Sequence, residues 1–182
     1  MRSKIGLLAG ALVLSFAPAL IARAALPPSV SDEFNGRDAP AFSLVTIDGA
    51  QVTLGSLKGR PLLVSFFASW CPPCRKEIGQ LTALHQKYAA RGLAIVGAAV
   101  DSKLLSSTPA EQERSDVATV VQRLSIPYPV GIASQKLAED FHFKGIPTTV
   151  VVGTDGKIVK TFYGYHDAAK IEAIVQQILA QR

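Results

Sequence analysis

The two cysteines of the chain stand three residues apart, in the segment Trp70-Cys71-Pro72-Pro73-Cys74. A thiolate is the nucleophile in disulfide exchange, and two thiols at this spacing can close a disulfide within one molecule. At the start of a helix, the helix dipole and the unpaired amides stabilise a thiolate at Cys71. Cys74, one turn further along, is then placed to attack the mixed disulfide that Cys71 forms. The pattern predicts a redox-active dithiol in which Cys71 attacks and Cys74 resolves.

Other uses of two cysteines fit the sequence less well, with one exception. A structural disulfide that closes so short a loop stabilises a fold by only about 2 kcal/mol. A zinc site generally takes four ligands, and the chain has neither a second cysteine pair nor a ligand spacing among its 3 histidines. The peroxiredoxin pattern requires a proline and a threonine or serine where this chain has Val64 and Ala68. Two thiolates can also hold copper(I), and this alternative stays open.

A buried strand and a helix must flank the cysteines if they are to work in this way. Residues 61–67 form a continuous apolar run, which is typical of a strand buried on both faces. Between residues 72 and 91, apolar residues recur at steps of three and four, and Gly92 provides a stop. The cysteines are therefore predicted to lie where a central strand passes into a helix.

The remaining pattern predicts an α/β domain with a mixed sheet. Apolar runs bounded by turn residues predict a hairpin at 42–45 and 51–54, and further strands at 93–100, 128–132, 148–152 and 158–163. Helices are predicted at 109–124, at 135–141 and, after an Asp167 cap, near the C-terminus. The strands separated by helices are expected to be parallel, and the last two antiparallel, because only a short turn joins them.

The first 24 residues have the composition of an export signal. Arg2 and Lys4 precede an apolar stretch over 5–21, and Ala22-Arg23-Ala24 offers small residues at the positions that a signal peptidase reads. A retained membrane anchor is the competing interpretation, although this stretch is at the lower limit for a span. Both interpretations place the rest of the chain outside the cytoplasm.

Residues 25–37 contain two prolines and a glycine and are predicted to form a linker to a domain at 38–182. With 48% hydrophobic residues, the chain can enclose a single core. Beyond the first 24 residues, 16 basic residues face 14 acidic ones, and the basic residues are scattered. This near balance argues against nucleic acid as a partner.

Further motifs stand in order around the cysteines. They are FFASWCPPCRKE at 66–77, APAFSL at 39–44, LKGR at 57–60, GIPTT at 145–149 and DGKI at 155–158. Over residues 38–180 this set resembles the thioredoxin superfamily, and in particular its exported TlpA/ResA/DsbE-like branch, a redoxin or AhpC/TSA-like domain. The resemblance implies a thioredoxin fold, with a central mixed sheet flanked by helices, an N-terminal β-hairpin and a central helix-strand insert at 102–132.

The resemblance also assigns roles outside the cysteine pair. It implies that Pro147 is a cis proline facing the cysteines and that the backbone of Ile146 pairs with an extended substrate. Thioredoxin has a buried acid six residues before its first cysteine, where this chain has Ser65. The proton-transfer role is therefore expected at Glu77, which lies one turn after Cys74 on the same helix face.

The residues next to the cysteines complete the predicted site. Trp70 is expected to form a flat wall beside the sulfur atoms and, with Pro72 and Pro73, to contact the substrate. Arg75 and Lys76 fit a solvated helix face, with a role in partner choice that the sequence does not specify.

Together these features predict an exported thiol:disulfide oxidoreductase without a dissociable cofactor or metal. We expect it to be a monomer. The family implies a protein in the periplasm or on the outer face of the cytoplasmic membrane, where it reduces selected protein disulfides. Examples are the haem-site cysteines of apocytochrome c and a metal-site thiol pair. A membrane thiol-transfer protein is expected to supply electrons, because the compartment is oxidising. A copper(I) chaperone and a disulfide-donating oxidase are the alternatives that use the same two sulfur atoms.

Overall fold

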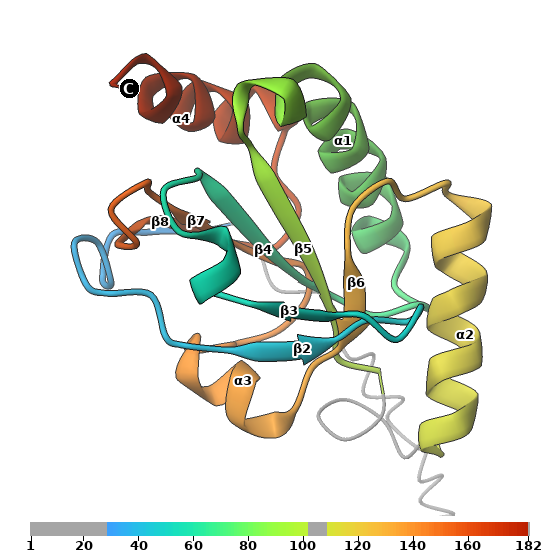
Figure 1. Cartoon of the computed structure of the whole chain (residues 1–182). Helices are drawn as coiled ribbons and strands as arrows, with labels where there is room; N and C mark the ends of the chain where they lie inside the picture. The colour runs from blue at the N-terminus through green and yellow to red at the C-terminus, as the bar shows by residue number, and fades with distance from the viewer. Residues whose placement is uncertain (1–28, 102–108, 182) are drawn as a thin grey trace, which may run out of the picture.

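A mixed sheet with helices on both sides forms the fold (Figure 1). The structure is a computed structural model that describes residues 29–101 and 109–181. Within these ranges the sheet has the strand order β1-β8-β7-β4-β5-β6, and β2 and β3 form a separate hairpin. The strands are β1 (Ser29–Ser31), β2 (Ser43–Val45), β3 (Gln51–Thr53), β4 (Leu62–Phe67), β5 (Ala94–Ala99), β6 (Val130–Ile132), β7 (Thr148–Val152) and β8 (Ile158–Tyr163).

Four α-helices lie in the described part of the chain. They are α1 (Pro72–Tyr88), α2 (Ala110–Arg123), α3 (Gln135–Asp140) and α4 (Ala168–Ala180), and two 3-10 helices lie at Gly55–Leu57 and Ala89–Arg91. Strands β4, β5 and β6 are parallel, whereas β7 is antiparallel to both β4 and β8. The α/β class, the mixed sheet and the predicted order of elements are therefore confirmed.

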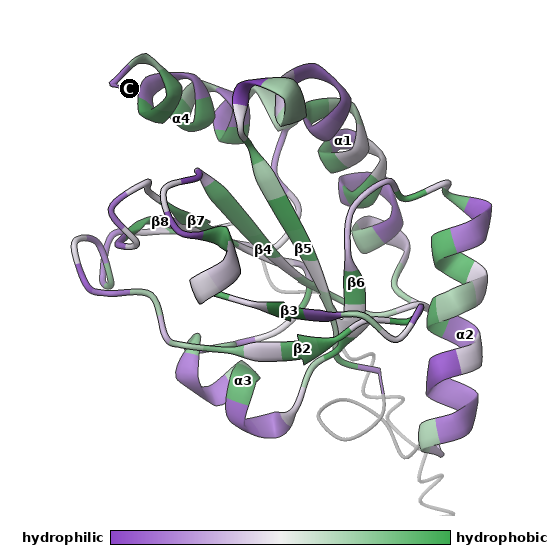
Figure 2. Cartoon of the chain, in the orientation of Figure 1, coloured by the Kyte–Doolittle hydropathy of each residue, from purple (hydrophilic) through white to green (hydrophobic). Residues whose placement is uncertain are grey.

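The central strand β4 divides the core into two sides because successive side chains point to opposite faces. The Phe66 ring packs on one face, with its centroid 5.7 Å from that of Phe141 just after α3. Ser65 points to the other face, which α1 covers. All six residues of β4 and all six of β5 are buried, and Figure 2 colours both strands hydrophobic along most of their length. Helices α1 and α4 pack together on the same side (Figure 1).

The β2–β3 hairpin is attached to the sheet through β6. The Ile47 amide donates to the Val130 carbonyl over 2.8 Å, and Thr46 forms an isolated bridge with Gly131. A Cβ at position 131 would lie 2.4 Å from the Val45 carbonyl oxygen. Glycine is required at this position because the hairpin backbone crosses it so closely. The predicted insert thus supplies α2 and the strand on which the N-terminal hairpin rests.

The predicted linker at 25–37 is wrong for the residues that the structure describes. Ser29–Ser31 form strand β1, which pairs antiparallel with β8. The His166 Nε2 atom lies 3.1 Å from the carbonyl oxygens of both Ser29 and Tyr163. Phe34 is buried, and its ring stacks on that of His142 with centroids 4.0 Å apart. Strand β1 has only three residues, too few for a pattern of alternating apolar and polar side chains. It therefore forms because β8 offers an unpaired edge.

The predicted signal or anchor at 1–24 lies outside the described residues. Within residues 29–101 and 109–181, no helix has both the length and the hydropathy needed to cross a membrane.

Candidate functional site

A closed disulfide joins Cys71 and Cys74 where β4 leads into α1. The S–S distance is 2.11 Å, and the two Cα atoms are 5.3 Å apart. Cys71 is the N-cap of α1, and its Sγ atom accepts a hydrogen bond from the Cys74 amide over 3.3 Å. Pro72 and Pro73 have no amide hydrogen, so neither can donate to this sulfur. Cys71 retains 3% exposure and Cys74 none.

The segment before the cysteines is held in place by a buried acid that the sequence analysis did not single out. The Ser69 amide donates to both Asp101 carboxylate oxygens, over 2.9 and 3.0 Å, and the Ser69 hydroxyl also bonds to this carboxylate. Asp101 follows β5, which is parallel to β4, so both residues lie at the same edge of the sheet. Burial raises the pKa of Asp101, and the hydrogen bonds from Ser69 oppose this shift. The sequence signal that could have identified Asp101 is an acidic residue directly after the apolar run at 93–100.

Pro147 lies at the same edge of the sheet. Its peptide bond with Ile146 is cis, as the resemblance implies. The next residue, Thr148, pairs with Phe66 near the end of β4, which places Pro147 beside the segment that carries the cysteines. The Gly164 amide donates to the Pro147 carbonyl over 2.8 Å, so the loop is also tied to the end of β8. Ile146 is buried at 7% exposure.

Glu77 lies one turn after Cys74 on α1 and is buried against the sheet, with 1% exposure. The Thr149 hydroxyl donates to Glu77 Oε1 over 3.1 Å. Glu77 Oε2 and the hydroxyl of Ser65 have no hydrogen-bond partner in the described structure. Ser65 pairs with Thr149 across β4 and β7, so both side chains point toward α1. Ser65, which stands where thioredoxin has its buried acid, therefore faces α1 beside Thr149, the hydrogen-bond partner of Glu77.

The surroundings of Glu77 disfavour its charged form. Burial raises the pKa of Glu77 to about 7, and the hydrogen bond from Thr149 opposes the shift only in part. Tyr128, in the segment before β6, is also buried. Burial raises the pKa of Tyr128, and the nearby charge of Glu77 raises it further. A carboxyl group that titrates near neutral pH can accept and return a proton under physiological conditions.

The exposed side of the site carries aromatic and basic residues. Trp70, directly before Cys71, is 45% exposed. The Arg75 guanidinium lies 3.5 Å from the Trp70 carbonyl oxygen. Lys76 lies over the ring of Tyr165, with its Nζ atom 4.4 Å from the ring centroid. Tyr165 is a second residue that the sequence analysis did not single out, because it approaches α1 only in the tertiary structure.

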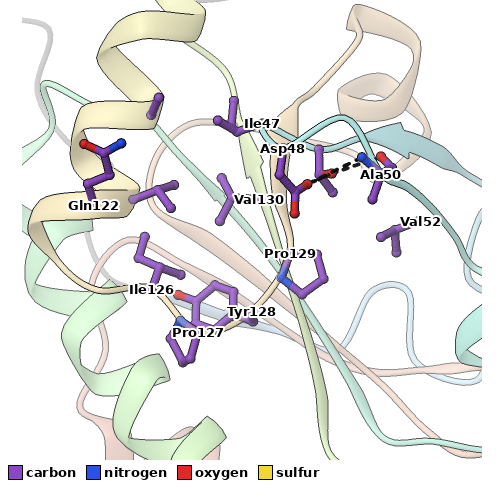
Figure 3. Close-up of a pocket in the computed structure, with 13 residues that line it drawn as sticks. Ile47, Asp48, Ala50, Val52, Gln122, Ile126, Pro127, Tyr128, Pro129 and Val130 are labelled. Atoms are coloured by element: carbon purple, nitrogen blue, oxygen red, sulfur yellow. Dashed lines mark hydrogen bonds between the residues drawn. The ribbon is translucent and has the colours of Figure 1, made fainter.

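A pocket of about 630 Å³ lies elsewhere, between the β2–β3 hairpin, α2 and the segment before β6 (Figure 3). Its walls include Ile47, Gln122, Tyr128 and Pro129, and neither cysteine is among them. Asp48 is its charged residue, and Figure 3 shows its carboxylate bonded within its own turn. The hydrogen bond from the Thr46 hydroxyl is the main cause that lowers the pKa of Asp48. The pocket is therefore separate from the disulfide site.

Comparison with known proteins places this arrangement in a family. The Redoxin family model matches residues 34–178. The thiol-disulfide oxidoreductase ResA of Bacillus cereus is 28% identical over 144 residues, which cover 79% of this chain and 78% of that protein. The thioredoxin-like protein YneN of Bacillus subtilis is 31% identical over 123 residues, or 68% of each chain.

Solved structures give the same result. A thiol:disulfide interchange protein of the thioredoxin family from Chlorobium tepidum superposes with a TM-score of 0.68 at 34% identity. The match covers 78% of this chain and 95% of that one. A putative thiol:disulfide interchange protein DsbE from Chlorobium tepidum superposes with a TM-score of 0.67 at 28% identity, over 80% and 96% of the two chains. The predicted thioredoxin fold is confirmed, and the chain belongs to the redoxin family.

Proposed function

We propose that this redoxin-family thiol:disulfide oxidoreductase works outside the cytoplasm as a reductant of selected protein disulfides. The disulfide between Cys71 and Cys74, at the junction of a buried strand and a helix N-terminus, carries the proposal. The similar proteins named as thiol-disulfide oxidoreductases support the same chemistry. The class of substrate, such as apocytochrome c or metal-site thiols, and a membrane thiol-transfer protein as electron donor are part of this proposal.

The reaction needs only the two cysteines and the partner disulfide. In the reduced protein, the Cys71 thiolate attacks one sulfur of the partner, forms a mixed disulfide and releases the other partner sulfur as a thiolate, which takes up a proton. The Cys74 thiolate then attacks Cys71 Sγ, which closes the disulfide and releases the second partner thiol. Two electrons pass from the dithiol to the partner. The electron donor restores the dithiol by the reverse exchange.

Four further residues support this cycle in the proposal. Pro147 and the backbone of Ile146, at the edge beside the cysteines, position an extended partner segment. Trp70 supplies an exposed flat surface next to Cys71. Glu77 accepts the Cys74 proton, directly or through one water molecule, and returns it when the disulfide is reduced again.

The direction of electron flow follows from the two prolines. Because neither Pro72 nor Pro73 can donate an amide hydrogen bond, the Cys71 thiolate lacks two donors that other residues would supply. A less stabilised thiolate disfavours the dithiol form and makes the couple more reducing.

We expect the Cys71–Cys74 couple to have a reduction potential near that of thioredoxin, about −270 mV. Pro72→Gly should lower the pKa of Cys71 and move the potential toward the oxidising range. Equilibration with glutathione buffers and pH titration of thiolate absorbance measure the two quantities. A wild-type potential near that of strong oxidases, about −120 mV, would reverse the direction and support a disulfide-donating oxidase.

Copper bound stoichiometrically to anaerobically purified protein would support the copper(I) chaperone instead.

Export is proposed from residues 1–24. We expect the mature protein to begin at or near Ala25, because the preceding Ala-Arg-Ala suits a signal peptidase. Mass spectrometry of the protein from the native cell envelope measures this end. A full-length species that requires detergent for extraction would establish the retained anchor.

A further inference from the structure

Aromatic and basic side chains lie on the exposed side of the first turns of α1, the helix that carries the disulfide. Trp70, Arg75, Lys76 and Tyr165 are called the rim here. Trp70 and Arg75 are neighbours in space at the start of α1, because the Arg75 guanidinium lies 3.5 Å from the Trp70 carbonyl oxygen. Lys76 stands one residue further and reaches the Tyr165 ring at 4.4 Å. Trp70, Arg75 and Lys76 are exposed, and Tyr165 is half-buried.

Tyr165 connects the cysteine helix to the loop that contains Pro147. Its hydroxyl accepts a hydrogen bond from Gln80 Nε2 over 2.6 Å, which fixes the ring against the exposed side of α1. The preceding residue, Gly164, donates its amide to the Pro147 carbonyl over 2.8 Å. The rim is therefore continuous with the loop beside which a partner segment would lie, and it is not an isolated patch on the helix.

The two rim cations have no acidic partner in the described residues. Five lysines elsewhere form ion pairs with carboxylates: Lys87, Lys136, Lys144, Lys157 and Lys160. Arg75 and Lys76 instead contact a carbonyl oxygen and a tyrosine ring. These contacts leave their charge uncompensated toward solvent.

No acid in the described residues forms an ion pair with Arg75 or Lys76. Glu77 is buried and bonded to Thr149, and Asp101 is turned inward to the Ser69 amide and hydroxyl. Asp167, two residues after Tyr165, is exposed and caps α4 through the Ala169 amide over 3.2 Å. The surface that runs from Trp70, next to Cys71, to Tyr165 therefore combines positive charge with two aromatic rings.

We propose that the rim selects partner disulfides that are flanked by acidic residues. The inference rests on the proposed function, because the partner segment must lie across Cys71 and the Pro147 loop during exchange. Carboxylates on that segment pair with Arg75 and Lys76, and its apolar or backbone atoms lie on the Trp70 and Tyr165 rings. Complementary charge speeds the encounter and fixes the orientation of the segment before the sulfur atoms react.

Matched peptides test this preference. Three peptides contain the same intramolecular disulfide and differ only in the residues that flank it, which are aspartate, lysine or serine. The second-order rate constant for their reduction by the pre-reduced protein is measured by stopped flow. At about 20 mM salt, we expect the aspartate peptide to react about tenfold faster than the lysine peptide, and this ratio to shrink at about 0.5 M salt.

Two double variants show whether the rim causes the preference. R75Q/K76Q should reduce the ratio of the aspartate rate to the lysine rate to about twofold or less. K58Q/R123Q removes the same charge from exposed positions at the opposite end of the sheet and should keep the wild-type ratio. Equal rates for all three peptides in the wild type, or an undiminished ratio in R75Q/K76Q, would overturn the inference.

A small neutral disulfide separates this inference from the proposed function. Bis(2-hydroxyethyl) disulfide carries no charge and reports the reductase chemistry alone. If the protein reduces it and shows no preference among the peptides, the rim inference is wrong and the proposed function stands. If the pre-reduced protein reduces neither this compound nor any peptide, the proposed function fails and the rim inference fails with it.

Discussion

Cys74→Ser is expected to hold the protein in covalent mixed disulfides with its partners. Cys71 is the N-cap of α1, retains 3% exposure, and keeps its attacking role in this variant. The group that would release the partner is lost, because a serine hydroxyl does not displace a thiolate from a disulfide at neutral pH. Turnover should fall to the uncatalysed level, about three orders of magnitude or more below the wild type.

Non-reducing electrophoresis and mass spectrometry of the native envelope detect these adducts. Cys71→Ser is the matched control, since it removes one thiol from the same motif. It should form no adducts, because Cys74 has no exposed surface from which to attack a protein disulfide. Equal trapping by both variants would show that the attacking and resolving sulfur atoms are assigned wrongly.

Glu77→Gln is expected to stabilise the oxidised protein at alkaline pH and not at acidic pH. Burial raises the pKa of Glu77 from 4.5 to about 7 in the folded protein. Between these values the folded state binds more protons than the unfolded state, so the free energy of unfolding falls as pH rises. The charged carboxylate lowers the free energy of unfolding by about 3 kcal/mol above pH 7, and this loss is absent below about pH 4.5. A glutamine has the same shape and never carries the charge.

Urea unfolding at about pH 4 and pH 8, with the disulfide closed, measures this difference. Comparing the two pH values cancels any constant effect of the amide on packing with Thr149 and Ser65. Tyr128 is the titratable group that faces Glu77 from the segment before β6, and it stays protonated at both pH values because its pKa is raised. Glu111→Gln removes an exposed acid from α2 and is the control. A pH-independent effect of Glu77→Gln would show that burial does not perturb this carboxyl group.

The same variant reports on the proposed proton transfer. If Glu77 accepts the Cys74 proton, Glu77→Gln should slow the resolution of mixed disulfides above the pKa of the carboxyl group, near pH 7. Wild-type resolution rates across this range would leave Glu77 with a structural role only.

Short-range patterns in the sequence were enough to predict the elements that position the site. The apolar run at 61–67 and the three-four periodicity after Pro72 place a buried strand directly before a helix, and the structure has β4 and α1 there. Asp167 was predicted as a helix cap, and its side chain accepts the Ala169 amide. Such features depend on residues within one or two turns of each other, so they can be read along the chain.

Contacts between distant residues could not be read in this way. Ser69 and Asp101 are 32 positions apart, and Gln80 and Tyr165 are 85 apart. Strand β1 has no pattern of its own and forms because β8 offers an unpaired edge. The register of β4 with β7 decides that Thr149 stands opposite Ser65 and meets Glu77.

The sequence by itself determined the chemistry of this protein, because disulfide exchange needs two thiols at a fixed spacing and that spacing is local. It also determined which strand and helix present those thiols. Only the tertiary structure decided the environment of the site. This environment comprises the buried and poorly solvated carboxyl of Glu77, the bonds to Asp101 that hold Ser69 before the cysteines, and the cationic rim around Tyr165. The physical reason is that burial and charge depend on which distant segments pack together, and the sheet register and the close crossing at Gly131 fix that packing.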